Sequence, residues 1–182
     1  MECIIIHEIV EITLGITVLI LFFSKRFPIM YKSRLALVVG IFFLIEPVAD
    51  VFIGKATNLF EFIGAVMLLI IIERFIAANT KGTINPYPVL LSVIFGLSIV
   101  ILKNETKYLH AGELFAFALI AFRLATTIEF VGWAYRDILL LASFITLFGI
   151  IAFLSGFIIL SSFLYFEGIF LMVLVLTEIV TA

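Results

Sequence analysis

Most carboxylates and both histidines of this chain lie inside apolar runs or at their edges, where they could bind a cation or carry a proton. In two places a histidine precedes a glutamate by three or four residues: His7 lies four residues before Glu11, and His110 lies three residues before Glu113. Residues at this spacing share one face of a helix. Carboxylates held together away from water must share a proton, pair with a basic group or bind a cation. The expected chemistry is therefore the binding of a cation or a proton.

The candidate ligands gather mainly at one end of the predicted helices, where they would form an acidic vestibule. The predicted ion- or substrate-binding residues are Glu8, Glu11, Glu46, Asp50, Glu113 and Arg123. His7 and His110 are the predicted metal ligands, since imidazole with carboxylate suits zinc, manganese or iron. Carboxylates alone suit calcium, magnesium or a proton relay. Glu61 opens a predicted helix at the same end, where the helix dipole by itself favours a carboxylate.

Arg123 is the most informative basic residue, because it falls near the middle of an apolar run. A guanidinium keeps its charge there and needs an anion or water. Glu46, at a comparable depth in another run, is its predicted partner. The pair would be either a structural ion pair or part of a substrate-binding or gating site. Glu73 and Arg74, by contrast, have the pattern of an interfacial pair.

The elements that position these residues must be membrane helices. Of the 182 residues, 65% are hydrophobic and 13% charged, and the mean hydropathy is +1.36. A soluble domain is about half apolar and a quarter charged. The formal charge of −2 gives no basic surface for nucleic acid, and the single cysteine, Cys3, excludes an internal disulfide framework. We predict an all-α integral membrane protein of the cell membrane, with residues 1–182 as one multi-pass domain and the lipid bilayer as its partner.

The apolar runs predict seven transmembrane helices, with six as the alternative. Residues 138–180 stay apolar for about twice the length of one crossing, so they predict a helical hairpin, with its turn near Ser161 and Ser162. The run 89–102 is short, and whether it crosses decides between six and seven. Four further runs have the length of one span: 4–23, 35–53, 59–78 and 111–131.

An internal similarity favours seven helices, whereas the loop charges are compatible with six or seven. With seven, most loop Lys and Arg residues fall on one side, which predicts the N-terminus outside and the C-terminus in the cytoplasm. Residues 4–78 and 110–180 align at a nearly constant offset, which predicts a 3+1+3 parallel repeat with 89–102 as the linker helix. Chance alignment of apolar sequence is the alternative. In layout this repeat is similar to the SWEET-type sugar transporters, although their Pro-Gln signature is missing.

One short motif bears on the kind of ion. The sequence His7-Glu8-Ile9-Val10-Glu11 resembles the Arg-Glu-x-x-Glu motif of the membrane ferric permeases, with histidine in place of arginine. The resemblance covers these five residues and implies a role in handling a metal.

These features favour a small secondary transporter or channel for a cation, either a proton or a divalent metal, entering through the acidic vestibule. A second hypothesis is a non-catalytic subunit or scaffold of a larger membrane complex, or a homo-oligomer. A third is a metal-dependent intramembrane lipid hydrolase that uses His7 and His110 with Glu11 or Asp50. Catalysis is the less favoured class, because the sequence contains no Gly-x-Ser-x-Gly, His-Glu-x-x-His or phosphate-loop motif.

Overall fold

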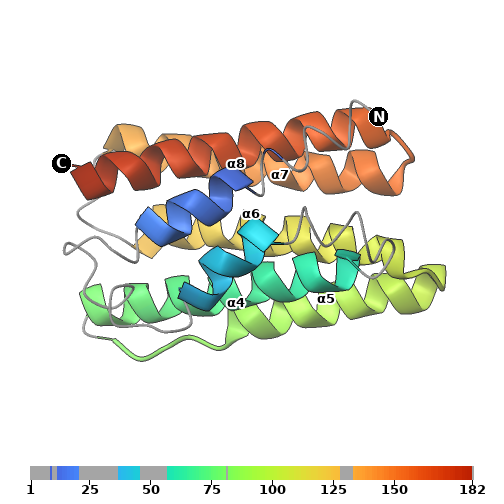
Figure 1. Cartoon of the computed structure of the whole chain (residues 1–182), viewed down its shortest axis with the longest axis horizontal. Coiled ribbons are helices and arrows are strands. Elements are labelled where there is room, and N and C mark those ends of the chain that lie inside the picture. The colour runs from blue at the N-terminus through green and yellow to red at the C-terminus, as the bar shows by residue number, and fades with distance from the viewer. Residues whose placement is uncertain are drawn as a thin grey trace.

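The computed structural model describes residues 9, 12–20, 37–45, 57–80, 82–127 and 133–181. All regular secondary structure in these residues is helical, so the predicted all-α fold is confirmed for this part of the chain (Figure 1). Segments 12–20 and 37–45 are helical. The elements that follow are α4 (Thr57–Asn79), α5 (Tyr87–Lys103), the short 3₁₀ helix η2 (Thr106–Tyr108), α6 (Leu109–Thr127), α7 (Trp133–Leu154) and α8 (Ile158–Thr181).

Helix α6 is the centre of the described bundle. It contacts α4, α5, α7 and α8, and α7 packs along α8. Alanines on several sides of α6 are buried, and such small side chains let neighbouring backbones approach closely. The buried alanines are Ala111, Ala116, Ala118, Ala121 and Ala125. Any polar side chain that α6 points inward therefore meets several helices.

The short apolar run 89–102 forms helix α5, which runs opposite to α4 and α6 (Figure 1). Because α4 and α6 point the same way, the chain has to return between them. The non-helical residues 82–86 and α5 make this return. Asn104 ends the helix in the left-handed conformation, with φ 54°, and its N–H donates to the carbonyl oxygen of Val100. The directions of α4 to α8 alternate as the seven-helix prediction requires.

Helix α5 meets α6 through glycines. A Cβ atom added to Gly112 would lie 2.7 Å from the Cα atom of Gly96. The buried face of α5 consists of Pro88, Ser92, Gly96 and Ile99. Ser92 and Gly96 form a small-xxx-small motif, which permits this close helix contact. This motif was not among the features predicted from the sequence.

The predicted turn of the C-terminal hairpin was wrong. Helix α7 ends at Leu154, and the turn is formed by residues 155–157 instead of Ser161 and Ser162. Gly156 has φ +86°, a conformation that glycine adopts without steric cost. Its N–H donates to the carbonyl oxygen of Phe153, and the N–H of Phe157 donates to that of Ala152, as in a Schellman C-cap.

The two serines are compatible with the interior of α8, because each hydroxyl group has a carbonyl oxygen to bond. Ser161 Oγ donates to the carbonyl oxygen of Gly149 on α7, at 2.9 Å. Ser162 Oγ donates to the carbonyl oxygen of Ile158, one turn earlier, at 3.1 Å. Serine in an apolar run therefore joins helices here and does not interrupt one.

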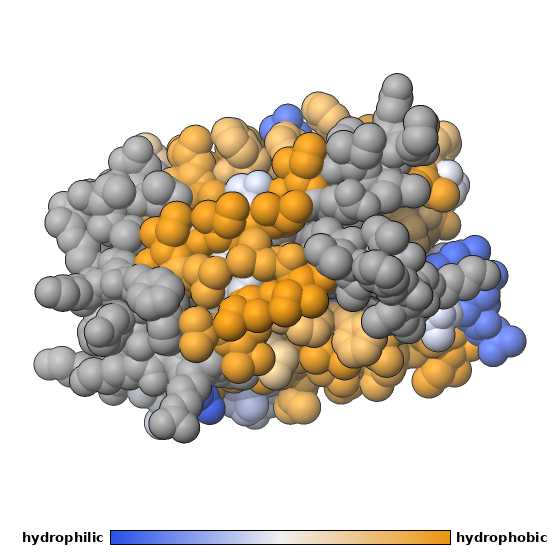
Figure 2. Space-filling view, in the orientation of Figure 1, coloured by the Kyte–Doolittle hydropathy of each residue, from blue (hydrophilic) through white to orange (hydrophobic). Residues whose placement is uncertain are grey.

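Three helical segments are long and apolar enough to cross a membrane: Thr106–Thr126, Trp133–Leu154 and Ile158–Leu176. Apolar side chains cover the middle of the face in Figure 2, and the largest hydrophilic group lies at its right-hand end, where α5 leads into α6. Helix α4 has a similar length but carries Glu61, Glu73 and Arg74. Both of these glutamates are buried in the bundle.

Gly168 allows α8 to pack closely on α7, and we expect Gly168→Ala to lower the free energy of unfolding by about 1–3 kcal/mol. An added Cβ atom would overlap Oγ1 of Thr146 and lie 3.3 Å from the carbonyl oxygen of Ala142. Thr146→Ala removes the overlapping atom, so the double variant should recover most of the loss relative to Thr146→Ala alone. Melting curves in mild detergent measure both effects. Equal losses in the two backgrounds would show that the overlap is not the cause.

Candidate functional site

Two carboxylates and an imidazole converge where α4 and α6 begin. Glu61 comes from α4, and His110 and Glu113 come from α6. One ligand atom from each lies within 4.8 Å of the other two. His110 Nδ1 is 2.8 Å from Glu113 Oε2 and 3.9 Å from Glu61 Oε2. We call these three residues the Glu–His–Glu cluster.

The cluster lies away from solvent. Glu61 is 3% exposed and Glu113 is fully buried, while the side chain of His110 is 13% exposed. An ionised carboxylate is costly in an apolar interior unless a positive charge or several donors compensate it. Two carboxylates at this separation therefore favour the uptake of positive charge, as a proton or as a metal ion.

Tyr165 on α8 joins the cluster from the other side. Its hydroxyl group donates to Glu113 Oε1 at 2.7 Å, and its side chain is fully buried. The ring of His110 lies edge-on to two aromatic rings, with centroids 5.1 Å from Phe153 on α7 and 5.5 Å from Tyr165. Four helices, α4, α6, α7 and α8, thus fix the positions of the ligand atoms.

The local sequence explains half of this geometry. His110 and Glu113 are three residues apart in the first turns of α6, so they share a face and bond to each other. The other half depends on Glu61, which lies 49 residues before His110 in the chain and reaches the cluster because α4 and α6 run in parallel. The glycine contact between Gly112 and Gly96 packs α5 against the same end of α6.

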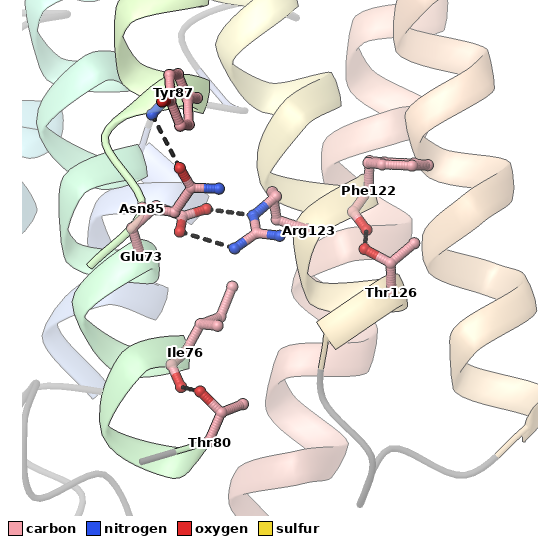
Figure 3. A network of polar contacts seen from close by, with 8 residues as sticks. All are labelled: Glu73, Ile76, Thr80, Asn85, Tyr87, Phe122, Arg123 and Thr126. Atoms are coloured by element: carbon pink, nitrogen blue, oxygen red, sulfur yellow. Dashed lines mark hydrogen bonds and ion pairs between the residues drawn. The ribbon is translucent and has the colours of Figure 1, made fainter. Parts of the chain in front are cut away.

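A second polar contact joins α4 and α6 toward their other ends (Figure 3). Arg123 Nε donates to Glu73 Oε1 at 2.5 Å, and Arg123 Nη2 donates to Glu73 Oε2 at 2.9 Å. The Glu73 side chain is 1% exposed and the Arg123 side chain 21%. This bidentate geometry is the strongest form of an arginine–carboxylate pair.

The structure corrects one sequence-based interpretation of this pair and leaves another untested. Arg123 is bonded to Glu73, and its predicted partner Glu46 lies outside the described residues, so that pairing stays a prediction. Glu73 is buried, so it is not part of an interfacial pair with Arg74. Within the described part of helix α6, Leu109–Thr127, Arg123 lies closer to Thr127 than to Leu109.

An apolar layer separates the two polar contacts. Glu61 and Glu73 are twelve residues apart on α4, about 18 Å along the helix axis. Between them, Leu69 and Ile72 of α4 and Phe117 of α6 are each at most 2% exposed. Among the described helices, the two polar contacts therefore lie on opposite sides of a layer of buried apolar side chains.

The structure brings together some of the predicted site residues and leaves others untested. His110 and Glu113 contact each other, as their spacing on one helix predicts. Arg123 belongs to the separate pair with Glu73. Tyr165 was not predicted as a site residue. Its place inside an apolar run could have indicated a polar partner, because a buried tyrosine hydroxyl group usually needs one. Five predicted residues lie outside the described residues: His7, Glu8, Glu11, Glu46 and Asp50. The proposed repeat partly depends on such residues and stays a prediction.

No protein-family model matches this chain, and no curated protein or solved structure is significantly similar to it. Its function is therefore inferred from the Glu–His–Glu cluster and the helices around it.

Proposed function

We propose that this chain is a multi-pass membrane protein that binds a divalent metal ion at Glu61, His110 and Glu113 and transports it across the bilayer. The observation that carries the proposal is the Glu–His–Glu cluster, whose three ligand atoms lie within 4.8 Å of one another. One imidazole with two carboxylates is a ligand set suited to zinc, manganese, iron or cobalt.

The outer surface of the described helices supports a membrane location. Phe144, Phe148 and Ile151 on α7 are each about 60% exposed, and Ile159 on α8 is 75% exposed. Exposed apolar side chains in contiguous rows are unfavourable in water and favourable in lipid. We place the N-terminus outside the cell membrane and the C-terminus in the cytoplasm, which puts the Glu–His–Glu cluster toward the outside.

The mechanism we propose is exchange of protons for metal. Imidazole and carboxylate ligands bind a metal in their deprotonated forms, so binding releases protons. The apolar layer between the cluster and the Glu73–Arg123 pair supports transport by a conformational change and not through an open pore. Release toward the cytoplasm would require α4 and α6 to separate near Glu73 and Arg123.

Metal binding is tested on the full-length chain purified in mild detergent and treated with chelator. We expect added Zn²⁺, Mn²⁺ or Co²⁺ to raise the melting temperature, since a ligand at 100 times its Kd adds about 2.7 kcal/mol of stability. His110→Ala and Glu61→Gln each remove one of three ligands and should weaken binding about 100-fold or more, beyond the effect of an outer-shell change. Glu105→Gln is the matched control, because Glu105 is an exposed carboxylate near the same end of α6.

Transport is tested by reconstituting the protein in vesicles that enclose a metal-sensitive dye. We expect metal uptake by the unmodified protein and by Glu105→Gln, and none above background by Glu61→Gln. Absence of metal binding by the unmodified protein would overturn the proposal. Binding without uptake would exclude transport by the isolated chain and favour its role as a subunit of a larger membrane complex.

A further inference from the structure

Tyr165 occupies one of the two oxygen atoms of Glu113 and thereby limits how this carboxylate can bind a metal. The Tyr165 hydroxyl group donates to Glu113 Oε1 at 2.7 Å, while Glu113 Oε2 is the oxygen that faces His110 Nδ1, at 2.8 Å. A metal ion placed among the three ligands would meet Oε2. Because Oε1 already accepts the hydrogen bond of Tyr165, Glu113 would bind the metal ion through Oε2 alone, which we call single-oxygen binding.

The aromatic contacts keep this arrangement rigid. Tyr165 packs edge-on to Phe117, with ring centroids 5.8 Å apart, as well as to His110. Phe153 on α7 also packs edge-on to the ring of His110. Tyr165 and Phe117 are each at most 1% exposed, so rotation of either ring would require the core to open. The phenol group therefore cannot leave Glu113 without moving α8.

Single-oxygen binding has a consequence for the choice of metal. Calcium takes six to eight oxygen ligands and commonly needs a two-oxygen carboxylate. Zinc and cobalt accept about four ligands, with nitrogen among them. A site with one imidazole nitrogen and carboxylates bound through one oxygen each favours the low coordination number.

We propose that Tyr165 is the specificity-determining residue of this site, selecting zinc-like ions by holding Glu113 in single-oxygen binding. This inference rests on the proposed metal site and goes beyond it, because it assigns selectivity to a residue that does not itself touch the metal. Tyr165 is thus a positioning residue, and its hydrogen bond links the selectivity of the site to the position of α8.

The test compares the full-length unmodified protein with Tyr165→Phe, each titrated with Zn²⁺, Co²⁺, Mn²⁺ and Ca²⁺ in detergent. We expect the unmodified protein to give the intense visible absorption of four-coordinate Co²⁺. Tyr165→Phe removes the hydrogen bond to Glu113 Oε1, so this oxygen no longer has to be shared with a phenol group when Glu113 binds a metal, and the cobalt bands should weaken. The ratio of Zn²⁺ to Mn²⁺ affinity should fall about tenfold, the scale of one hydrogen bond to a charged group. Tyr135→Phe is the matched control, because it removes the same hydroxyl group from another tyrosine. Tyr135 is half-buried near the start of α7, whereas Phe153, which contacts His110, lies near the end of that helix.

The outcomes separate this inference from the proposed function. If the unmodified protein binds no metal, the proposed function is wrong and the inference falls with it. If metal binds but Tyr165→Phe leaves both the cobalt spectrum and the affinity ratio unchanged, the inference alone is overturned. If Tyr165→Phe does not fold, X-ray absorption of the unmodified zinc-loaded protein decides. Four nitrogen or oxygen neighbours without a two-oxygen carboxylate support the inference, and five or more neighbours overturn it.

Discussion

Replacing Arg123 with methionine while keeping Glu73 is expected to lower the free energy of unfolding by about 3–5 kcal/mol, the usual cost of leaving one charge of a buried pair without its partner. Glu73 is 1% exposed and receives two hydrogen bonds from Arg123. Methionine has a similar length and fills much of the same space. The loss therefore reports the charge that is left behind and not a cavity.

The converse variant and the double variant separate the pair from its parts. Glu73→Gln leaves a guanidinium beside a neutral amide and should be destabilising too, by a smaller amount because Arg123 is 21% exposed. Glu73→Gln combined with Arg123→Met removes both charges. We expect the double variant to be more stable than Arg123→Met, with a coupling energy of about 1–3 kcal/mol.

The chain contains its own control for this experiment. Lys107 Nζ lies 2.6 Å from Glu105 Oε2, but both side chains are more than half exposed. Water and salt screen such a pair. Glu105→Gln should therefore leave the unfolding transition unchanged. Equal effects at Glu105 and Glu73, measured by denaturant titration in detergent, would contradict the assignment of Glu73–Arg123 as a buried pair.

Gly112→Ala is expected to lower the free energy of unfolding by about 2–3 kcal/mol and to detach α5 from α6. The added Cβ atom would lie 2.7 Å from the Cα atom of Gly96, and the Phe62 ring is 2.8 Å away. A ring can rotate, but a backbone atom moves only if the whole helix moves. Overpacking of this kind is at the upper end of the usual range of 1–3 kcal/mol.

Gly149→Ala is the matched control, since it places the same methyl group in another buried helical position. Its Cβ atom would lie 3.5 Å from the nearest atom, Leu164 Cβ, which is an ordinary contact. Alanine also favours a helix over glycine by about 1 kcal/mol, so we expect no loss or a small gain in stability. Protease protection of the loop after α5 measures the detachment. Similar losses at Gly112 and Gly149 would show that the loss at Gly112 does not come from its close contact with Gly96.

The positions of the described helices were largely predictable from hydropathy. The predicted run 59–78 corresponds to Thr57–Asn79 and the run 89–102 to Tyr87–Lys103. The hairpin turn was misplaced because Ser161 and Ser162 and Gly156 are all compatible with a turn by residue type. Only Gly156 adopts the left-handed conformation that closes α7, and the serine hydroxyls bond to helix carbonyl oxygens.

The site was predictable only where it is local. His110 and Glu113 share a face because of their spacing, which is a property of a single helix. Glu61 and Tyr165 reach them from α4 and α8, which are distant in the chain: Glu61 lies 49 residues before His110, and Tyr165 lies 52 residues after Glu113. Arg123 was recognised as a residue that needs an anion, but Glu46 was predicted as its partner and Glu73 was interpreted as an interfacial residue.

The sequence by itself determined the apolar helices and the presence of costly charged groups among them, because both follow from composition and from the 3.6-residue period of a helix. Tertiary structure alone decided which charges meet. Pairing depends on the direction of each helix, on its rotation about its axis and on its close contacts, such as that between Gly96 and Gly112. Those quantities arise from the packing of many side chains at once. Accordingly, Glu61 joins His110 at one end of the core, and Glu73 joins Arg123 at the other.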